Sequence, residues 1–223
     1  PLLRDPQPRL FLALAFIISL MIVVSRETHL GLETFPDRWE EATHAVFSVV
    51  SVMTGTGFAT RPYDTWGDPV IALFLFATFL GGCAGSAAGG IKMFRLEITA
   101  KAIRAWSQRM VQPHRKAPIR YARRIVDEDT LQSVMVFLFL YLVTFMVSAA
   151  LLSFSGLDTM SAISAAAACV SNVGPGLGPV VGPSTNYASL NDFATWVCTV
   201  TMLLGRLEFM VVFAVLTPRF WRG

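Results

Sequence analysis

Two glycine-rich segments of the chain could place backbone carbonyl oxygens around a cation. The segment 54–58, Thr-Gly-Thr-Gly-Phe, follows one short apolar stretch, and the segment 171–176, Ser-Asn-Val-Gly-Pro-Gly, follows another. Carbonyl oxygens can replace the hydration shell of a permeating ion, and glycine allows the backbone dihedral angles that such a loop needs. A single segment of this kind is as easily a plain turn. Two of them in equivalent positions favour a cation pore.

A third glycine-rich segment, 81–90, lacks the spacing of known catalytic or nucleotide-binding loops. Ile91 separates Gly90 from Lys92, which breaks the GxxxxGK pattern of a phosphate-binding loop. The residues around Ser86 do not form the GxSxG turn of a serine hydrolase. The ordinary explanation for such a segment in an apolar chain is close helix packing through small residues.

Arg206 is a charged residue within an apolar run, where a charge is costly and usually functional. Glu208 points to a different face of a helix, so we do not expect it to neutralise Arg206 directly. An intramembrane hydrolase could use Arg206, Glu208 and Ser86. However, the apolar runs carry no paired carboxylates or histidines that could act as a base or hold a metal ion.

Cysteine and histidine spacing does not indicate a metal site. The cysteines lie in apolar stretches without CxxC spacing, so we expect buried structural thiols and no structural zinc. The histidines are scattered and have no companion at ligand spacing. We therefore assign no chemistry to these residues, which are Cys83, Cys169, Cys198, His29, His44 and His114.

The composition predicts a membrane protein. Of 223 residues, 54% are hydrophobic and 15% are charged, whereas a soluble domain carries roughly 25% charged residues. A membrane-spanning helix needs about 20 apolar residues. Four runs approach this length, although the second is too short to cross alone: 10–24, 70–80, 131–152 and 193–216.

The order of these segments repeats along the chain. A short helix is predicted over 36–53 and another over 157–170, each between two apolar runs and each followed by a glycine-rich loop. We therefore predict an all-α integral membrane protein with two repeats of helix M1, pore helix and helix M2. The first repeat covers 1–105 and its M2 helix is broken at 81–90. A basic linker covers 106–126, and the second repeat covers 127–223.

The distribution of charge predicts how the chain is oriented. Residues 92–124 hold ten lysines and arginines against one acid, whereas 25–69 and 153–192 together hold three basic and nine acidic residues. The positive-inside rule places 92–124 and both termini in the cytoplasm. The basic cluster is as consistent with contact to anionic membrane lipid as with a partner site, and nucleic acid is not an expected partner.

Four motifs in this order and spacing resemble the membrane subunit of Trk-type potassium uptake systems, in the superfamily that also holds the Ktr and HKT transporters. The resemblance covers essentially the whole chain. The motifs are MTGTGFAT at 53–60, GGCAGSAAGGIK at 81–92, NVGPGLG at 172–178 and LGRLE at 204–208.

The resemblance implies roles for particular residues. The family has four repeats around one pore, of which this chain matches the third and fourth. A potassium-selective filter would then use the backbone of Thr54, Gly55, Thr56, Gly57, Asn172, Val173 and Gly174. An intramembrane gating loop would comprise Gly81, Gly82, Gly85, Ser86, Gly89, Gly90 and Lys92, with Arg206 facing the pore beneath it.

The resemblance also implies a setting. It suggests a bacterial inner membrane, a cytoplasmic nucleotide-binding regulatory subunit and a homodimer of the full-length subunit. Because the first two repeats are absent and the chain begins at the edge of a span, we interpret it as the C-terminal half of a longer subunit or as one of two associating copies. A channel, a symporter and a non-conducting scaffold remain open on sequence alone.

Overall fold

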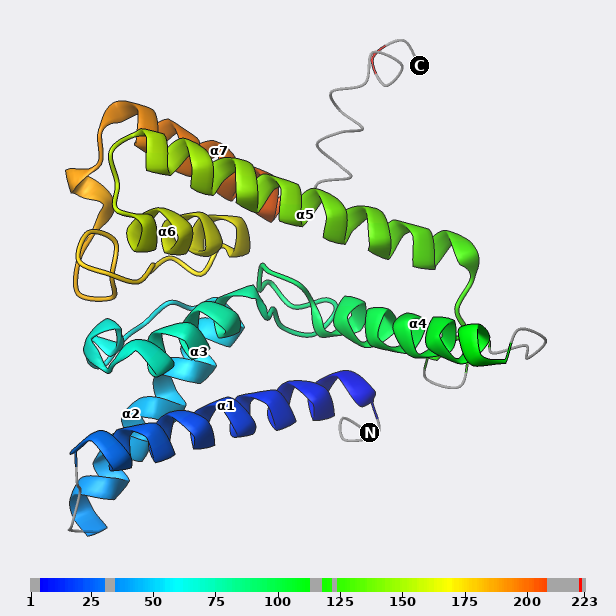
Figure 1. Cartoon of the computed structure of the whole chain (residues 1–223), viewed down its shortest axis with the longest axis horizontal. Coiled ribbons are helices and arrows are strands. Elements are labelled where there is room, and N and C mark those ends of the chain that lie inside the picture. The colour runs from blue at the N-terminus through cyan, green and yellow to red at the C-terminus, as the bar shows by residue number, and fades with distance from the viewer. Residues whose placement is uncertain (1–4, 31–34, 113–117, 122–123, 208–220, 222–223) are drawn as a thin grey trace.

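The structure is a computed structural model that describes residues 5–30, 35–112, 118–121, 124–207 and 221. Its elements are helical apart from one small hairpin, and they pack side by side (Figure 1). In chain order, the α-helices are α1 (Pro6–Leu30), α2 (Phe35–Thr54), α3 (Asp68–Phe79), α4 (Met93–Val111), α5 (Glu128–Phe154), α6 (Thr159–Ser171) and α7 (Asp192–Arg206).

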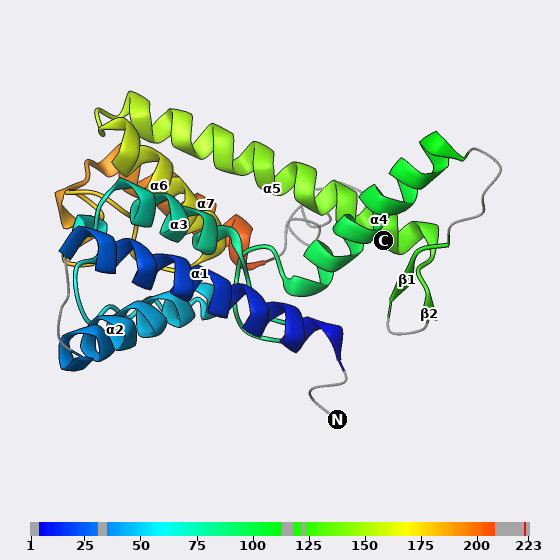
Figure 2. The same ribbon diagram turned by 60° about the horizontal axis from the view of Figure 1, so that its bottom comes forward.

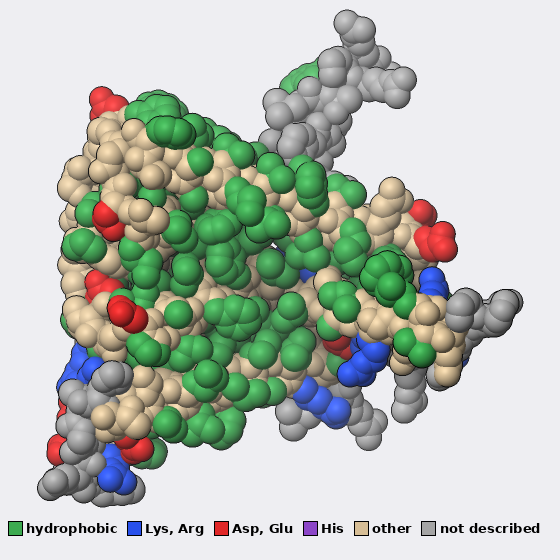
Figure 3. Space-filling view, in the orientation of Figure 1, with side chains coloured by type: hydrophobic (Ala, Val, Ile, Leu, Met, Phe, Trp, Pro, Cys, Tyr) green, Lys and Arg blue, Asp and Glu red, His purple; other side chains and the backbone are tan. Residues whose placement is uncertain are grey.

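Two of these helices are long and apolar enough to cross a membrane. They cover Pro6–Thr28 and Glu128–Phe154, and only 22% of the most apolar part of each is buried inside the protein. Figure 3 shows hydrophobic side chains over the middle of one face, with charged side chains gathered toward its two ends. An apolar band between charged ends suits a protein surrounded by lipid.

Several α-helices are joined by long segments that are not α-helical. Helix α3 ends at Phe79 and α4 begins at Met93, so the segment 80–92 is not helical. The run predicted over 193–216 is helical as α7 up to Arg206, and Glu208 lies outside the described residues. Short 3-10 helices, η2 (Tyr63–Thr65) and η3 (Tyr187–Ser189), lie in the loops after α2 and α6.

The stretch expected as a linker is more structured than the sequence indicates. Helix α4 continues past residue 105 to Val111, and the added residues 106–111 include no glycine or proline that would end it. Strands β1 (Arg120–Tyr121) and β2 (Arg124–Ile125) then form an antiparallel hairpin, a small departure from the all-α expectation (Figure 2).

Helix α6 is almost completely buried, because small side chains let its neighbours approach closely. Helices α3, α5 and α7 all contact it, and Ala165 and Ala168 are at most 1% exposed. The carboxylate of Asp158 caps the helix by accepting a hydrogen bond from the Ser161 N–H at 3.1 Å. Hydrogen bonding from Ser161 lowers the pKa of Asp158 below its ordinary value. The cap therefore stays ionised, beside the positive end of the helix dipole.

A cluster of charged residues ties the chain after residue 58 to helices α1 and α2. Glu41 is buried and accepts hydrogen bonds from Arg26 at 3.0 and 3.1 Å and from Arg61. Arg61 also pairs with Glu40, and Arg26 lies 4.9 Å from the ring centre of Trp66. The chain that follows the Thr-Gly-Thr-Gly segment is therefore fixed to α2 at Arg61.

We expect Glu41→Gln to lower the free energy of unfolding by about 3 kcal/mol, because it removes the counter-charge of the largely buried Arg26 and leaves Arg61 with the exposed Glu40 only. Glu40→Gln is the matched control, since its side chain also contacts Arg61 but is 60% exposed. That variant should lose less than about 1 kcal/mol. Thermal unfolding in detergent measures both, and equal losses would contradict the role given to burial.

Candidate functional site

The loop after α2 turns sharply through a fixed set of backbone hydrogen bonds. The Gly55 N–H donates to the Val52 carbonyl at 3.1 Å, and the Thr56 N–H donates to the Ser51 carbonyl at 3.0 Å. Gly55 and Gly57 have φ angles of 72° and 74°, which residues with a side chain rarely adopt. The local backbone therefore requires glycine at these two positions.

The loop after α6 follows the same path, 117 residues further on by alignment of Gly57 with Gly174. The Asn172 N–H donates to the Cys169 carbonyl at 3.1 Å, and the Val173 N–H donates to the Ala168 carbonyl at 3.0 Å. Asn172 and Gly174 have φ angles of 55° and 108°. Asparagine tolerates the left-handed conformation better than most residues. The repeat seen in the sequence thus extends to the backbone of the two loops.

The two loops contact each other through their backbones. A Cβ atom placed on Gly57 would lie 2.2 Å from the Val173 carbonyl oxygen, and one on Gly55 would lie 3.8 Å from that of Asn172. Any side chain at position 57 would push the loops apart. Glycine is required here by the close approach as well as by its φ angle.

The segment 80–91 forms a closed loop that reaches the second of these turns. The Gly81 N–H donates to the Ile91 carbonyl and the Ile91 N–H donates to the Phe79 carbonyl, both at 2.9 Å, which closes its neck. Beside this neck, a Cβ on Gly89 would lie 2.0 Å from the Ser171 carbonyl oxygen. The loop therefore packs directly against the end of α6.

Arg206 contacts the same loop from α7. Its guanidinium donates a hydrogen bond to the Ala87 carbonyl at 2.5 Å. The preceding residue, Gly205, sits so close to α6 that a Cβ there would lie 2.1 Å from the Val170 carbonyl oxygen. This contact brings the start of the second turn, the loop and Arg206 into one small region.

A cavity of about 510 Å³ joins these parts. It brings together residues of the first turn, of the loop and of two helices: Thr54, Gly55, Thr56, Gly82, Cys83, Ser86, Ala87, Ala88, Phe11 and Arg206. Gly89, Gly90 and Lys92 line an adjoining cavity of about 120 Å³ together with Arg206. Among the described residues lining the larger cavity, none comes from the second turn.

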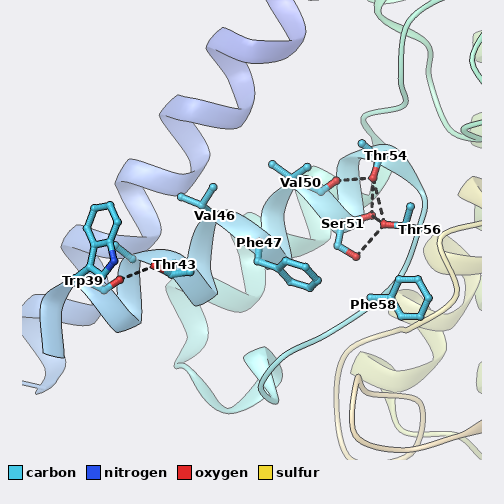
Figure 4. Close-up of a pocket in the computed structure, with 10 residues that line it drawn as sticks. Trp39, Thr43, Val46, Phe47, Val50, Ser51, Thr54, Thr56 and Phe58 are labelled. Atoms are coloured by element: carbon cyan, nitrogen blue, oxygen red, sulfur yellow. Dashed lines mark hydrogen bonds between the residues drawn. The ribbon is translucent and has the colours of Figure 1, made fainter. Parts of the chain in front are cut away.

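A second large cavity, about 640 Å³, lies on the other side of the first turn (Figure 4). Its wall is one face of α2, and its floor includes Thr54, Thr56 and Phe58. Phe58 is 72% exposed and Trp39 is 69% exposed. The first turn therefore separates an apolar outer surface from the cavity that contains Arg206.

Other predicted residues lie in different surroundings. All three cysteines are free thiols, but Cys83 is only half-buried and lines the cavity, which corrects the expectation that it is a core residue. Gly85 adopts a φ of 83° and faces open space at the tip of the loop. Its backbone conformation, not close packing, requires glycine.

Two tyrosines support the second turn, and sequence reasoning did not find them. The Tyr187 hydroxyl donates a hydrogen bond to the Gly174 carbonyl at 2.8 Å. The Tyr141 hydroxyl on α5 lies 2.6 Å from the Ser171 hydroxyl. Both contacts join residues at least thirteen positions apart, so no local sequence motif predicts them.

The fold and this site define a helical membrane protein in which irregular backbone is gathered at the ends of short buried helices. The family described as TrkH, cation transport protein, matches residues 2–220. The chain therefore belongs to the TrkH family of cation transport proteins.

The relatives are potassium uptake proteins of bacteria. The Trk system potassium uptake protein TrkI of Halomonas elongata is 38% identical over 221 residues, and TrkH of Escherichia coli K12 is 33% identical over 219. These matches cover 99% and 98% of this chain and 44% of each relative. The chain thus spans less than half the length of these relatives.

A solved structure has the same fold. The crystal structure of the potassium transporter TrkH from Vibrio parahaemolyticus superposes with a TM-score of 0.88 at 32% sequence identity. The match covers 99% of this chain and 46% of that chain. The helical architecture described above is therefore that of a membrane transport protein.

Gly205→Ala tests the close contact between α7 and α6, because this contact and helix propensity predict changes of opposite sign in the free energy of unfolding. Helix propensity alone predicts a gain of about 1 kcal/mol from replacing a helical glycine with alanine. The contact with the Val170 carbonyl predicts instead a loss of about 2 kcal/mol, because a backbone segment must move. Unfolding measurements in detergent distinguish the two, and a gain in stability would refute the tight contact.

Proposed function

We propose that this chain forms part of the pore of a potassium uptake protein, with the turns after α2 and α6 acting as its selectivity filter. The observation that carries this proposal is the shared backbone path of the two turns and their contact at Gly57 and Val173. The filter would consist of the backbone of Thr54, Gly55, Thr56, Gly57, Asn172, Val173 and Gly174.

The surroundings of the turns support this role. Irregular backbone at membrane depth is tolerated only where it is buried in protein or lines a water-filled cavity. Thr54, Gly55 and Thr56 line a cavity, and the negative ends of the α2 and α6 dipoles lie at the turns. This arrangement favours a cation over an anion.

A complete pore needs more protein than this chain supplies. The relatives are more than twice as long, and α2 exposes an apolar face beside the first turn. We propose that further segments of the same build, in a longer subunit or a second copy, pack there to close a ring around the filter. The proposal covers both passive potassium movement and movement coupled to another cation.

The loop over 80–91 would act as the gate below the filter. It contacts the end of α6 at Gly89, it bounds the cavity beneath the first turn, and Arg206 holds it at Ala87. A guanidinium in that position adds a positive charge on the path of a permeating cation. Gly81, Gly82, Gly85, Ser86, Gly90 and Lys92 complete the gate.

The setting of the proposed pore follows from charge and from the relatives. The basic region 92–124 would face the cytoplasm of a bacterium, where a nucleotide-binding regulatory subunit could dock and where anionic lipid is available. A homodimer of the full-length subunit is part of the same proposal. The alternative of an intramembrane enzyme is not supported, since the relatives are named as uptake proteins.

Replacing the filter glycines should reduce potassium selectivity. Gly57→Ser introduces a Cβ that meets the Val173 carbonyl, so the ratio of potassium to sodium uptake should fall about tenfold. Gly174→Ser strains only the φ angle, because nothing lies near its Cβ, so the ratio should fall less. Gly156→Ser is the matched control, with a φ of 97° in open space between α5 and α6. Uptake of both ions into vesicles carrying the full-length subunit measures selectivity, and unchanged ratios in both variants would remove the turns from the filter.

Arg206→Ala should raise potassium flux through the closed pore and weaken the response to the regulatory subunit, because it removes a charge and the bond to Ala87. Arg206→Lys should keep the charge but hold the loop less firmly, since lysine lacks the planar set of donors. Flux into vesicles is compared for the three proteins after size-exclusion chromatography. Equal flux and equal regulation in alanine variant and wild type would make Arg206 a structural residue.

A further inference from the structure

The gating loop is held at a second point besides its contact with Arg206. Gln7, in the first turn of α1, accepts a hydrogen bond from the Ala84 N–H at 2.7 Å. Arg206 on α7 binds Ala87, three residues further along the loop. Between these two contacts Gly85 faces open space. The tip of the loop is therefore flanked by two hydrogen bonds, one to α1 near the start of the chain and one to α7 near its end.

The other end of the Gln7 amide reaches the cytoplasmic hairpin. Its NH2 group donates a hydrogen bond to the Tyr121 hydroxyl on strand β1 at 2.6 Å. Gln7 is only 8% exposed, and both ends of its amide are satisfied. Loss of either partner would leave a buried polar group of the amide unpaired, which costs free energy. Each contact therefore holds the amide in the position that the other contact needs.

Tyr121 is itself held against α4. Its ring packs edge-on against Phe94 at 4.9 Å between ring centres, and Lys101 lies 5.5 Å from its ring centre. Lys101 also donates a hydrogen bond to the Arg120 carbonyl at 3.0 Å. The hairpin thus cannot move relative to α4 without disturbing the side chain that binds Gln7. Figure 2 shows the hairpin beside α4 and beyond the first turn of α1.

We propose that Gln7 is a positioning residue of the gate, which holds the loop at Ala84 and couples it to the β1–β2 hairpin through Tyr121. This inference rests on the proposed gating role of the loop. Arg120 on strand β1 is exposed, so an acidic face of a cytoplasmic protein that binds the hairpin there would act on the loop through Tyr121 and Gln7. Arg206 and Gln7 hold the loop independently, whereas Gln7 and Tyr121 act in series.

The test measures potassium flux into vesicles carrying the full-length subunit. Gln7→Leu should raise flux about fivefold with unchanged potassium-over-sodium preference, because one buried hydrogen bond to the loop is lost. Tyr121→Phe keeps the ring against Phe94 and removes only the hydroxyl, so it should raise flux about twofold. Added to Gln7→Leu, it should have no further effect.

Two further variants separate a positioning role from a merely structural one. Gln7→Glu should restore flux to within about twofold of wild type, because a carboxylate can accept hydrogen bonds from both the Ala84 N–H and the Tyr121 hydroxyl. Gln132→Leu removes an exposed amide on α5 and should leave flux unchanged. If Gln7→Leu does not fold, Tyr121→Phe alone decides.

The outcomes distinguish this inference from the function on which it rests. Deleting residues 84–87 should raise flux if the loop is the gate. If the deletion raises flux but Gln7→Leu and Tyr121→Phe match wild type, Gln7 is not a positioning residue. If the deletion also leaves flux unchanged, the gating role itself is overturned, and this inference with it. Additive effects of the Gln7 and Tyr121 variants would overturn the coupling to the hairpin.

Discussion

The close backbone contact around the end of α6 is the constraint on which the rest of the structure depends. Three segments that are far apart in the chain approach this point, and each does so at a glycine. Cβ atoms on Gly57, Gly89 and Gly205 would lie 2.0 to 2.2 Å from carbonyl oxygens of Val173, Ser171 and Val170. Only backbone fits there, so the first turn, the loop over 80–91 and α7 are placed relative to each other without intervening side chains.

Burial of α6 makes that contact possible. Its alanines and serines let α3, α5 and α7 surround a helix too short to cross a membrane. Two polar contacts hold the second turn. The Tyr187 hydroxyl donates to the Gly174 carbonyl, and the Asn172 side chain donates to the Met202 carbonyl of α7 at 3.1 Å. The turn is therefore held by polar contacts to more than one helix or loop, as the proposed filter role requires.

Polar side chains anchor the irregular segments at both ends of the molecule. At one end, Glu41 holds the chain after the first turn through Arg61. At the other end, Gln7 holds the loop through Ala84. Both Glu41 and Gln7 are 8% exposed, and a buried polar group without its partner destabilises the fold. The irregular backbone thus remains ordered because the helices around it supply specific partners.

The amino-acid sequence alone determined the apolar runs, the repeated glycine turns, the break at 81–90 and the basic composition of 92–124, because each is a local pattern of composition or spacing. The glycines of the two turns were found for the same reason, since a left-handed backbone selects its own residue type. Tertiary structure alone decided the partners. Ala87 for Arg206, Ala84 and Tyr121 for Gln7, and Gly174 for Tyr187 are contacts across 13 to 119 positions. Such pairs depend on how helices pack, and a polar side chain carries no local signal of which distant backbone group it will meet.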